Sequence, residues 1–337
     1  MTADGLSRHL GAVRSQAENL RRSRGVIEDQ LSGIDLGPWR GRRVALVGMG
    51  ASYNAALACM PTMWASGIRA SAWLGSDLEL PGAVANIEAA IVISQTGRSA
   101  EMVSAVRSLP DGLPTLALTD DPRSPLATES QMTIALGLLA DSEVRTLGYT
   151  GTLQALGILT EALAPDARPA DWAALADEVN RQIPRIEGLT ERLLEAMSGL
   201  VNFELVGSGA SFGTAAQGAL LLREVSRLAA SAYETRNYLH GPIEAVDDTT
   251  AFILFGGTRE ARLAESMAAV GASVLLVTFH EVSERPRLNV LRLSPASEAA
   301  RPVLEILPLQ TLSGSLARAR GVPVGEFRHH QDDTKVA

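Results

Sequence analysis

The sequence predicts an α/β protein in which one structural unit is used twice. The segment VGMGASY at 47–53 returns as VGSGASF at 206–212, an offset of 159 residues (from 47 to 206). In each copy an apolar run enters a glycine-rich turn that leads into a helix-like segment. Elsewhere, apolar runs of strand length alternate with helix-like segments, a pattern typical of a parallel sheet covered by helices on both faces. The 337 residues leave room for two such domains.

The first half of the chain supplies the elements of one unit. Apolar residues near a 3.6-residue period predict an amphipathic helix over 1–35. A turn at 36–42 leads to the buried strand VALVG at 44–48. The pattern then predicts, in order, a helix at 53–66, strands at 69–75 and 89–97, a helix at 99–109, strands at 115–120 and 132–136, and a helix at 150–163.

The second half repeats this order after a Pro- and Ala-rich boundary at 164–170 and one or two connecting helices at 171–197. We expect a strand at 201–207, a helix at 212–228, a turn-rich segment at 233–242, a strand at 251–257, a helix at 258–270, strands at 272–279 and 289–293, and a helix at 299–319. The predicted organisation is an N-terminal helix (1–35), a first domain (36–165), connecting helices (166–198), a second domain (199–322) and a C-terminal tail (323–337).

Composition restricts the class of function. The formal net charge of −8 argues against nucleic acid as the main partner, because a phosphate backbone attracts a basic face. No apolar run is long enough to span a bilayer, and the N-terminus lacks the apolar centre of a signal peptide, so we expect a cytoplasmic protein. The single cysteine, Cys59, excludes an internal disulfide and lies in an apolar segment, where we expect a small buried hydrophobe.

The segment SQTGRS at 94–99 is the strongest candidate for a binding site. It follows the apolar strand AAIVI and opens a helix, whose unpaired N–H groups and dipole favour an anion. Hydroxyls of Ser94, Thr96 and Ser99 crowd this turn, and Gly97 lets a ligand approach the backbone. Ser52 holds the equivalent place after the first strand. The pattern predicts a phosphate site made without lysine, although helix N-capping by Ser and Thr would explain part of it.

The glycine-rich turns do not match the pattern of a dinucleotide-binding site. A dinucleotide site needs a third glycine where this chain has Tyr53 and Phe212, and a ring there blocks close packing of helix on strand. In the second copy, the counterpart of 93–99 is FILFGGT at 252–258, which carries a single hydroxyl. We therefore expect the first copy to hold the phosphate and the second to have another role.

Two residues of the second half are candidates for proton transfer. Glu224 lies in the strongly apolar segment LLREVS, and a carboxylate in apolar surroundings is a candidate base. His240 lies in the turn LHGP, where an imidazole is free to shuttle a proton. A salt-bridged glutamate and a histidine at a helix start explain the same spacing, so both interpretations stay open at this point.

Together, VGMGASYNAA, VISQTGRSAE, GALLLREVS and SAYETRNYLHGPIE, with a tail containing one lysine, resemble the SIS (sugar isomerase) family over about residues 36–337. The chain is similar to the isomerase half of glutamine–fructose-6-phosphate aminotransferase and to its stand-alone relatives. The resemblance implies two tandem flavodoxin-like SIS domains, each a five-stranded parallel sheet in an αβα sandwich. It implies that Ser52, Ser94, Gln95, Thr96 and Ser99 bind the phosphate of a hexose 6-phosphate.

The resemblance also implies the catalytic roles. Glu224 matches the base that moves a proton between C1 and C2, and His240 matches the ring-opening histidine, which in relatives serves the neighbouring subunit. Lys335 matches the tail lysine that forms a Schiff base with the sugar carbonyl. It is the only lysine among the 30 Lys and Arg residues, and arginine cannot form a Schiff base because its guanidinium stays protonated.

The predicted function is that of a phosphosugar isomerase or aminosugar-6-phosphate deaminase that forms a homodimer. We expect no metal and no organic cofactor, since the sugar carbonyl stabilises the carbanion. The sequence also shows no glutaminase domain. Leu221 stands where relatives have a lysine, and 145–152 lacks the relatives' Ser-Thr-Lys run, so substrate or reaction could differ. A fructosamine-6-phosphate deglycase and a non-catalytic sugar-phosphate sensor remain alternatives.

Overall fold

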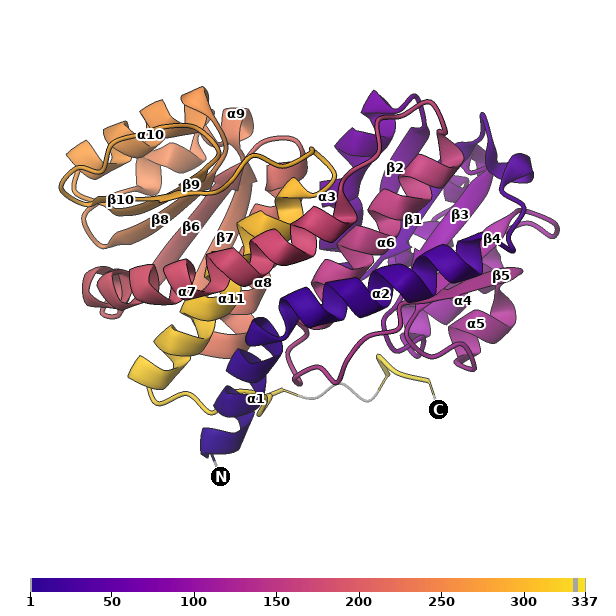
Figure 1. The fold of residues 1–337 in the computed structure, drawn as a ribbon, viewed down its shortest axis with the longest axis horizontal. Coiled ribbons are helices and arrows are strands. Elements are labelled where there is room, and N and C mark those ends of the chain that lie inside the picture. Colours follow the sequence, from indigo (N-terminus) through magenta and orange to yellow (C-terminus); the bar gives the residue numbers. More distant parts are fainter. Residues whose placement is uncertain (1, 330–332, 337) are drawn as a thin grey trace. The chain divides into compact units, whose positions relative to one another are not determined.

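The computed structural model describes residues 2–329 and 333–336. The chain divides into two compact units, each built around one sheet (Figure 1). The first-sheet unit comprises residues 18–139 and 147–172 and the described C-terminal residues from 328 on. The second-sheet unit comprises residues 2–17, 140–146 and 173–327. Each unit is described by itself below.

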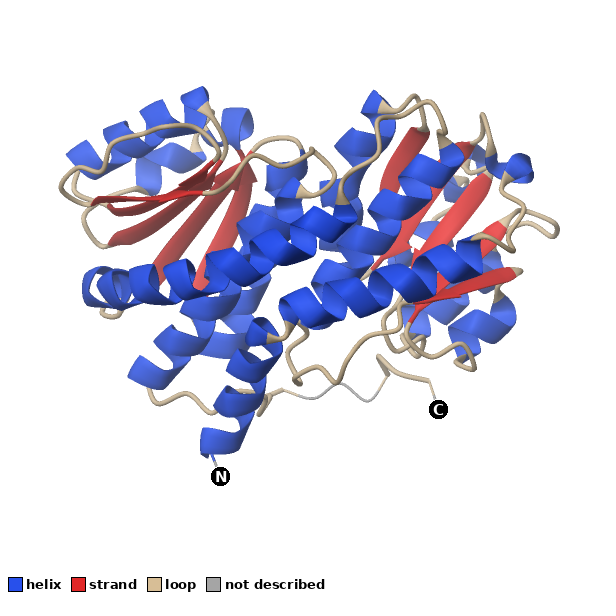
Figure 2. Cartoon of the chain, in the orientation of Figure 1, coloured by secondary structure: helices blue, strands red, loops and turns tan. Residues whose placement is uncertain are grey.

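The first-sheet unit contains a five-stranded parallel sheet in the order β2-β1-β3-β4-β5. Its central strands are buried along their whole length because helices lie on both faces (Figure 2). The strands are β1 (Arg43–Gly48), β2 (Arg69–Leu74), β3 (Ala89–Ile93), β4 (Thr115–Thr119) and β5 (Met132–Ala135). The helices are α2 (Gln16–Leu31), η1 (Gly37–Trp39), α3 (Ala51–Ala65), η2 (Gly75–Glu79), η3 (Ala83–Asn86), α4 (Ala100–Ser108), α5 (Pro125–Glu129) and α6 (Leu147–Leu163).

The second-sheet unit repeats this architecture with the order β10-β9-β8-β6-β7, again all parallel. Its strands are β6 (Asn202–Gly207), β7 (Ala229–Glu234), β8 (Thr250–Phe255), β9 (Ser273–Thr278) and β10 (Leu288–Arg292). Its helices are α1 (Thr2–Arg14), α7 (Trp172–Met197), α8 (Ala210–Ser226), α9 (Thr235–Tyr238), η4 (Pro242–Ala245), α10 (Thr258–Ala269) and α11 (Arg301–Ala319). The predicted fold class, two α/β units with five-stranded parallel sheets, is confirmed.

Strand order fixes where a ligand can bind in each unit. From β1 the chain continues to the edge strand β2, whereas from β3 it continues to β4 on the other side, so the β1/β3 border is a topological switch point. The β6/β8 border is its counterpart in the second sheet. Loops at the carboxyl ends of strands diverge at such a border and leave room for a ligand. Each unit therefore has one position where the fold itself favours binding.

Two element predictions were wrong. The sequence pattern predicted no strand before the turn at 233–242, but Ala229–Glu234 forms β7, an edge strand with only one fully buried residue. The single helix expected over 1–35 is two helices, α1 and α2, which meet at Ser15. The break falls close to the point where the chain passes from the second-sheet unit to the first-sheet unit. Among the described helices, none is long and apolar enough to cross a membrane.

Candidate functional site

The turn between β1 and α3 positions Ser52 at the first switch point. Gly48 ends β1, and a Cβ there would lie 2.7 Å from backbone atoms of Ser52 and Tyr53, so only glycine permits this sharp turn. Gly50 has a φ of 52°, in the left-handed region that glycine tolerates. Ser52 follows in the first turn of α3, and no hydrogen bond to its hydroxyl occurs among the described residues. This hydroxyl is available to a ligand.

The segment 94–99 leaves β3 beside it and turns back on itself. The Gly97 N–H donates to the Ser94 carbonyl at 2.9 Å, and the Leu126 N–H donates to the Gly97 carbonyl at 3.0 Å. Gly97 has a φ of 62°, and a Cβ there would lie 1.9 Å from the Ser124 hydroxyl. In this structure the position of a Cβ at Gly97 is taken by Ser124, the N-cap of α5, so glycine lets the loop pack against α5. The expected approach of a ligand to the Gly97 backbone stays a prediction.

Polar atoms without partners gather in this segment. The Ser94 side chain is buried, yet its hydroxyl makes no hydrogen bond to any described residue. The Oε1 atom of Gln95 is also buried and has no partner in the described part of the chain. Gly148 leaves room for the Gln95 amide, since a Cβ there would lie 2.9 Å from Gln95 Cδ. Buried polar atoms are normally satisfied, so the Gln95 oxygen is a candidate to bind a ligand. The Ser94 hydroxyl, which makes no hydrogen bond to a described residue, is a second candidate. We call Ser52 and residues 94–99 the first cradle.

The C-terminal tail pairs with the first cradle. Ser99 and Lys335 form an antiparallel β-bridge, the Ala100 N–H donates to the Thr334 carbonyl (3.2 Å), and the Val336 N–H donates to the Arg98 carbonyl (2.9 Å). The tail thus occupies one of the free N–H groups that open α4. The contact runs through the backbone, and the side chain of Lys335 is exposed. The structure thereby places Lys335 next to the predicted phosphate site, within the same unit.

Glu224 lies in the second-sheet unit, on α8. Its side chain is exposed in the single chain, but desolvation by the surrounding protein raises the pKa of its carboxyl. No hydrogen bond or ion pair to this carboxylate occurs among the described residues. The salt-bridge interpretation is therefore not supported, and a carboxylate with a raised pKa and free oxygens suits a general base.

His240 lies in the turn between α9 and η4, with an exposed side chain. Its backbone N–H donates to the Asn237 carbonyl at 3.0 Å. Hydrogen bonds on both sides fix the segment that leads into this turn. The Glu234 carboxylate accepts from the backbone N–H groups of Arg236 and Asn237 (2.8 Å each). The Tyr238 hydroxyl donates to the Glu204 carboxylate on β6. His240 is thus held at a fixed turn, and its imidazole has no hydrogen-bond partner in the described part of the chain, which suits a proton shuttle.

Other positions that the sequence singled out also have clear places. Cys59 is buried, and burial raises the pKa of its thiol to about 12, so it behaves as the expected small hydrophobe. Leu221 is fully buried on α8, one helical turn before Glu224. Among the described residues no group of His, Cys, Asp and Glu could hold a metal ion.

Sequence analysis missed a buried carboxylate in the second-sheet unit. Glu305 on α11 is only 1% exposed and accepts hydrogen bonds from the hydroxyls of Ser211 (2.8 Å) and Thr214 (3.1 Å). Burial raises the pKa of Glu305 to about 7, although both hydrogen bonds and the nearby Arg301 oppose this shift. The lone acidic residue in the apolar run PVLEILPL was the signal that could have drawn attention to it.

Glu305 predicts a pH dependence of stability. The folded pKa lies above the unfolded value of 4.5, so the stabilising effect is complete below pH 4.5 and is lost as pH rises to about 7. This gap corresponds to about 3 kcal/mol. We expect Glu305→Gln to lose that dependence, so in urea unfolding wild type should lose stability relative to Glu305→Gln as pH rises from 5 to 8. Parallel stability curves over that range would contradict the assignment.

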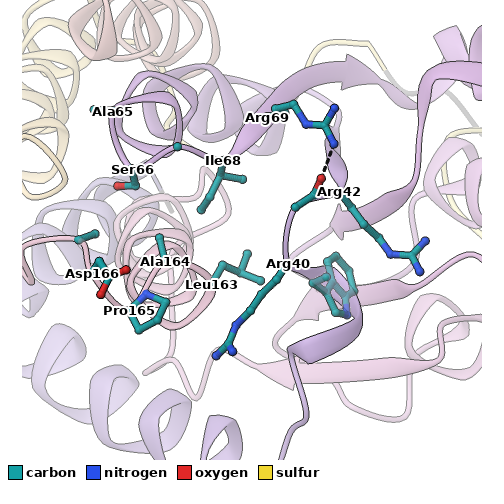
Figure 3. Close-up of a pocket in the computed structure, with 14 residues that line it drawn as sticks. Arg40, Arg42, Ala65, Ser66, Ile68, Arg69, Leu163, Ala164, Pro165 and Asp166 are labelled. Atoms are coloured by element: carbon teal, nitrogen blue, oxygen red, sulfur yellow. Dashed lines mark hydrogen bonds between the residues drawn. The ribbon is translucent and has the colours of Figure 1, made fainter.

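A pocket of the first-sheet unit lies away from the first cradle. It has a volume of about 360 Å³ and is lined by residues that precede β1 and β2 and follow α6, with Arg40, Arg42, Arg69 and Asp166 around it (Figure 3). The Arg69 guanidinium donates to the Gly41 carbonyl across its rim. The pocket is at the amino ends of the strands, opposite the first cradle. Ligands of parallel sheets bind at the carboxyl ends, so we assign the site to the cradle.

Comparison with known proteins places this geometry in a family. Residues 39–164, which contain the first cradle, match the model of the SIS domain. The predicted resemblance to the SIS domain family is thus confirmed for this part of the chain.

Relatives and solved structures cover more of the chain. The chain is 26% identical over 331 residues to a glutamine–fructose-6-phosphate aminotransferase from Arabidopsis thaliana, covering 90% of this chain and 48% of that protein. It spans about half the length of the curated relatives it matches. The C-terminal domain of the glucosamine–fructose-6-phosphate aminotransferase from Francisella tularensis superimposes with a TM-score of 0.81 at 21% identity, covering 94% of this chain and 96% of that domain.

A stand-alone protein has the same fold. The glucosamine-6-phosphate deaminase from Thermotoga maritima superimposes with a TM-score of 0.79 at 23% identity, covering 98% of this chain and the whole of that one. The fold of this chain, two units with five-stranded sheets, is therefore shared with both solved structures.

Proposed function

We propose that the chain binds a hexose 6-phosphate and catalyses proton transfer between its C1 and C2 atoms, as a phosphosugar isomerase or aminosugar-6-phosphate deaminase. The observation that carries the proposal is the first cradle, in which unpartnered polar atoms of Ser94 and Gln95 lie beside the free hydroxyl of Ser52 at a topological switch point. The printed names of the structural relatives, an aminotransferase domain and a deaminase, agree with such a substrate.

The phosphate would be held by hydroxyls and N–H groups rather than by a lysine. Ser52, Ser94 and Thr96 would supply hydroxyl donors, and the Gln95 amide an N–H donor. The Ser99 hydroxyl donates to the Glu101 carboxylate (3.2 Å) and the Ala100 N–H to the Thr334 carbonyl (3.2 Å), so both groups would have to exchange these partners for the phosphate. Neutral donors at a helix start suit a phosphate, because the helix dipole adds positive character without a competing counter-ion. The remaining departure from relatives, the missing lysines, lies outside this group of residues.

The second-sheet unit would supply the acid–base groups. His240 protonates the ring oxygen as the sugar opens, which yields the free carbonyl. Glu224 then removes the proton from C2 and returns it to C1 through an enediol or enolamine. Its raised pKa helps, because a carboxylate with a pKa closer to neutrality is a stronger base and takes the C2 proton more readily. Lys335 would meet the open-chain carbonyl as a Schiff base, and its tail already pairs with Ser99.

The same proton transfer serves several reactions. On an aldose phosphate it produces the ketose phosphate. On glucosamine 6-phosphate it produces a ketimine, which water hydrolyses to fructose 6-phosphate and ammonia. On a fructosamine 6-phosphate it runs in the opposite direction, and hydrolysis releases the amine and an aldose phosphate. We rank isomerisation and deamination above deglycation, and we propose a homodimer in which His240 completes the site of the neighbouring copy.

A substrate screen tests the proposal. Purified protein is incubated with glucosamine 6-phosphate, fructose 6-phosphate and fructosamine 6-phosphates, while ammonia, amine and the product sugar are measured. We expect turnover of at least one 6-phosphate and none of the unphosphorylated sugars, because the cradle requires the ester. Equal turnover with and without the phosphate would contradict a site at 94–99.

One observation favours a second candidate, a sugar-phosphate sensor without catalysis. Leu221 is fully buried, and a leucine side chain does not ionise. It therefore cannot handle a proton as the lysine expected at this position in relatives would. The screen separates the candidates when it is paired with thermal-shift measurements. A sensor would be stabilised by hexose 6-phosphates and release no product in any assay.

A further inference from the structure

The second-sheet unit contains a counterpart of the first cradle. Gly207 ends β6 as Gly48 ends β1, and a Cβ there would lie 2.6 Å from the backbone of Ser211. Gly209 has a φ of 58°, against 52° for Gly50, so the two turns have the same backbone course. The repeat offset then makes Ser211 the counterpart of Ser52. We call Ser208, Ser211, Thr235 and Gly257 the second cradle, because they follow β6, β7 and β8 at the second switch point.

The donors of the second cradle converge on one carboxylate. Glu260, only 4% exposed, accepts from the Thr235 hydroxyl (2.8 Å) and the Ser208 hydroxyl (3.3 Å) through Oε1. Its Oε2 accepts from the Gly257 N–H at 2.9 Å. Gly256 permits this approach, since it has a φ of 154° and a Cβ there would lie 2.4 Å from Glu260 Oε2. Donors that follow three different strands therefore surround a single anionic group.

The counterpart of Ser52 is satisfied in the same way. Ser211 donates its hydroxyl to Glu305 at 2.8 Å, whereas the Ser52 hydroxyl has no partner among the described residues. The two acidic side chains are close enough to interact, because the charge of Glu260 contributes to raising the pKa of Glu305. The hydroxyls of the second cradle are thus already bonded to the carboxylates of Glu260 and Glu305, whereas the Ser52 hydroxyl of the first cradle has no such partner.

Ordinary helix capping explains only part of this arrangement. A glutamate in the first turn of a helix commonly accepts from the backbone N–H that precedes it, which accounts for the bond from Gly257. It does not require hydroxyls from the ends of β6 and β7. Those two bonds give Glu260 the coordination that a bound phosphate or carboxylate would receive from a switch-point site.

We propose that Glu260 is a built-in anion that occupies the second cradle and thereby restricts the chain to one phosphate ester, held in the first. This inference rests on the proposed ester site for its functional meaning. Glu260 is then a residue that determines where the substrate binds: it satisfies the donors that would otherwise attract an ester to the wrong unit.

Replacing the carboxylate tests this. In Glu260→Ala the donors lose their partner, so the protein should melt several degrees below wild type in chloride buffer. Inorganic phosphate should restore the melting temperature, by about 2 °C or more for each tenfold rise above its dissociation constant. Equilibrium dialysis with radiolabelled phosphate should find one more phosphate per chain in Glu260→Ala than in wild type. Glu260→Gln keeps the cradle filled and should bind the same number as wild type.

The counts separate this inference from the proposed function. One bound phosphate per chain in wild type and two in Glu260→Ala would support both the ester site in the first cradle and the role of Glu260. No bound phosphate in wild type and one in Glu260→Ala would support only the role of Glu260. Equal numbers in the two proteins overturn the inference. If Glu260→Ala does not fold in chloride, it and Glu260→Ser are refolded in phosphate. Recovery of either supports the proposal, and failure of both counts against it, because a fitting anion should replace the carboxylate.

Discussion

Glu224→Gln should lower kcat by about 10²–10⁴-fold, the usual contribution of a positioned acid–base group. The amide has nearly the same size as the carboxyl but cannot accept the C2 proton. Because Glu224 makes no hydrogen bond or ion pair with any described residue, the change should leave the fold and the melting temperature almost unaffected. KM should change little, since the proposed phosphate contacts lie in the other unit. The measurement is steady-state turnover of the 6-phosphate that the screen identifies.

A matched control is available on α7. Glu195 is another exposed helical glutamate, and Glu195→Gln removes the same charge from the surface. We expect it to retain wild-type kcat and KM. If Glu224→Gln also retains full turnover, Glu224 is not the base. A rise in KM with kcat unchanged would assign it to binding instead.

Gly97→Ala should disable the first cradle. The added methyl group would lie 1.9 Å from the Ser124 hydroxyl, and the backbone at position 97 has a φ of 62°. The left-handed conformation alone costs an alanine about 1 kcal/mol, and the collision forces the 94–99 loop away from α5. We expect KM for the 6-phosphate to rise at least tenfold, with a loss of stability of a few kcal/mol, measured by steady-state kinetics and urea unfolding.

Two further variants isolate the collision from the backbone strain. Gly67 also has a positive φ, 78°, but a Cβ there meets nothing within 4 Å, so Gly67→Ala should lose about 1 kcal/mol and keep its KM. Adding Ser124→Gly to Gly97→Ala removes the clashing side chain and should recover much of the lost affinity. A Gly97→Ala protein with wild-type KM would show that the loop does not bind the ester.

The sequence pattern predicted the fold because the signals were local and strong. Each of the repeated glycine turns marks a position where a strand and the helix after it approach too closely for a side chain. A Cβ at Gly48 or at Gly207 would collide with the backbone of that helix. The edge strand β7 was missed because its small, half-exposed residues carry little of the apolar pattern that identifies central strands. The N-terminal break was missed because it lies close to the point where the chain passes from one unit to the other, which no local pattern marks.

The candidate site was predictable only in part. Residues 94–99 and Ser52 are recognisable because hydroxyls follow apolar strands, which is visible within a few residues of sequence. The pairing of the tail with Ser99 and Ala100 joins segments that lie more than two hundred residues apart, and no local pattern encodes it. The same holds for Glu260 and Glu305, whose partners follow strands distant in sequence.

Binding of the ester in the first cradle is the claim on which the proposed function depends. A crystal structure of the protein soaked with glucosamine 6-phosphate or fructose 6-phosphate tests it most directly. The account predicts phosphate oxygens within hydrogen-bond distance of the Ser94 and Ser52 hydroxyls, with the Gln95 side chain also engaged. Phosphate density at the arginine-lined pocket near Arg40, or in the second cradle of the unaltered protein, would contradict it.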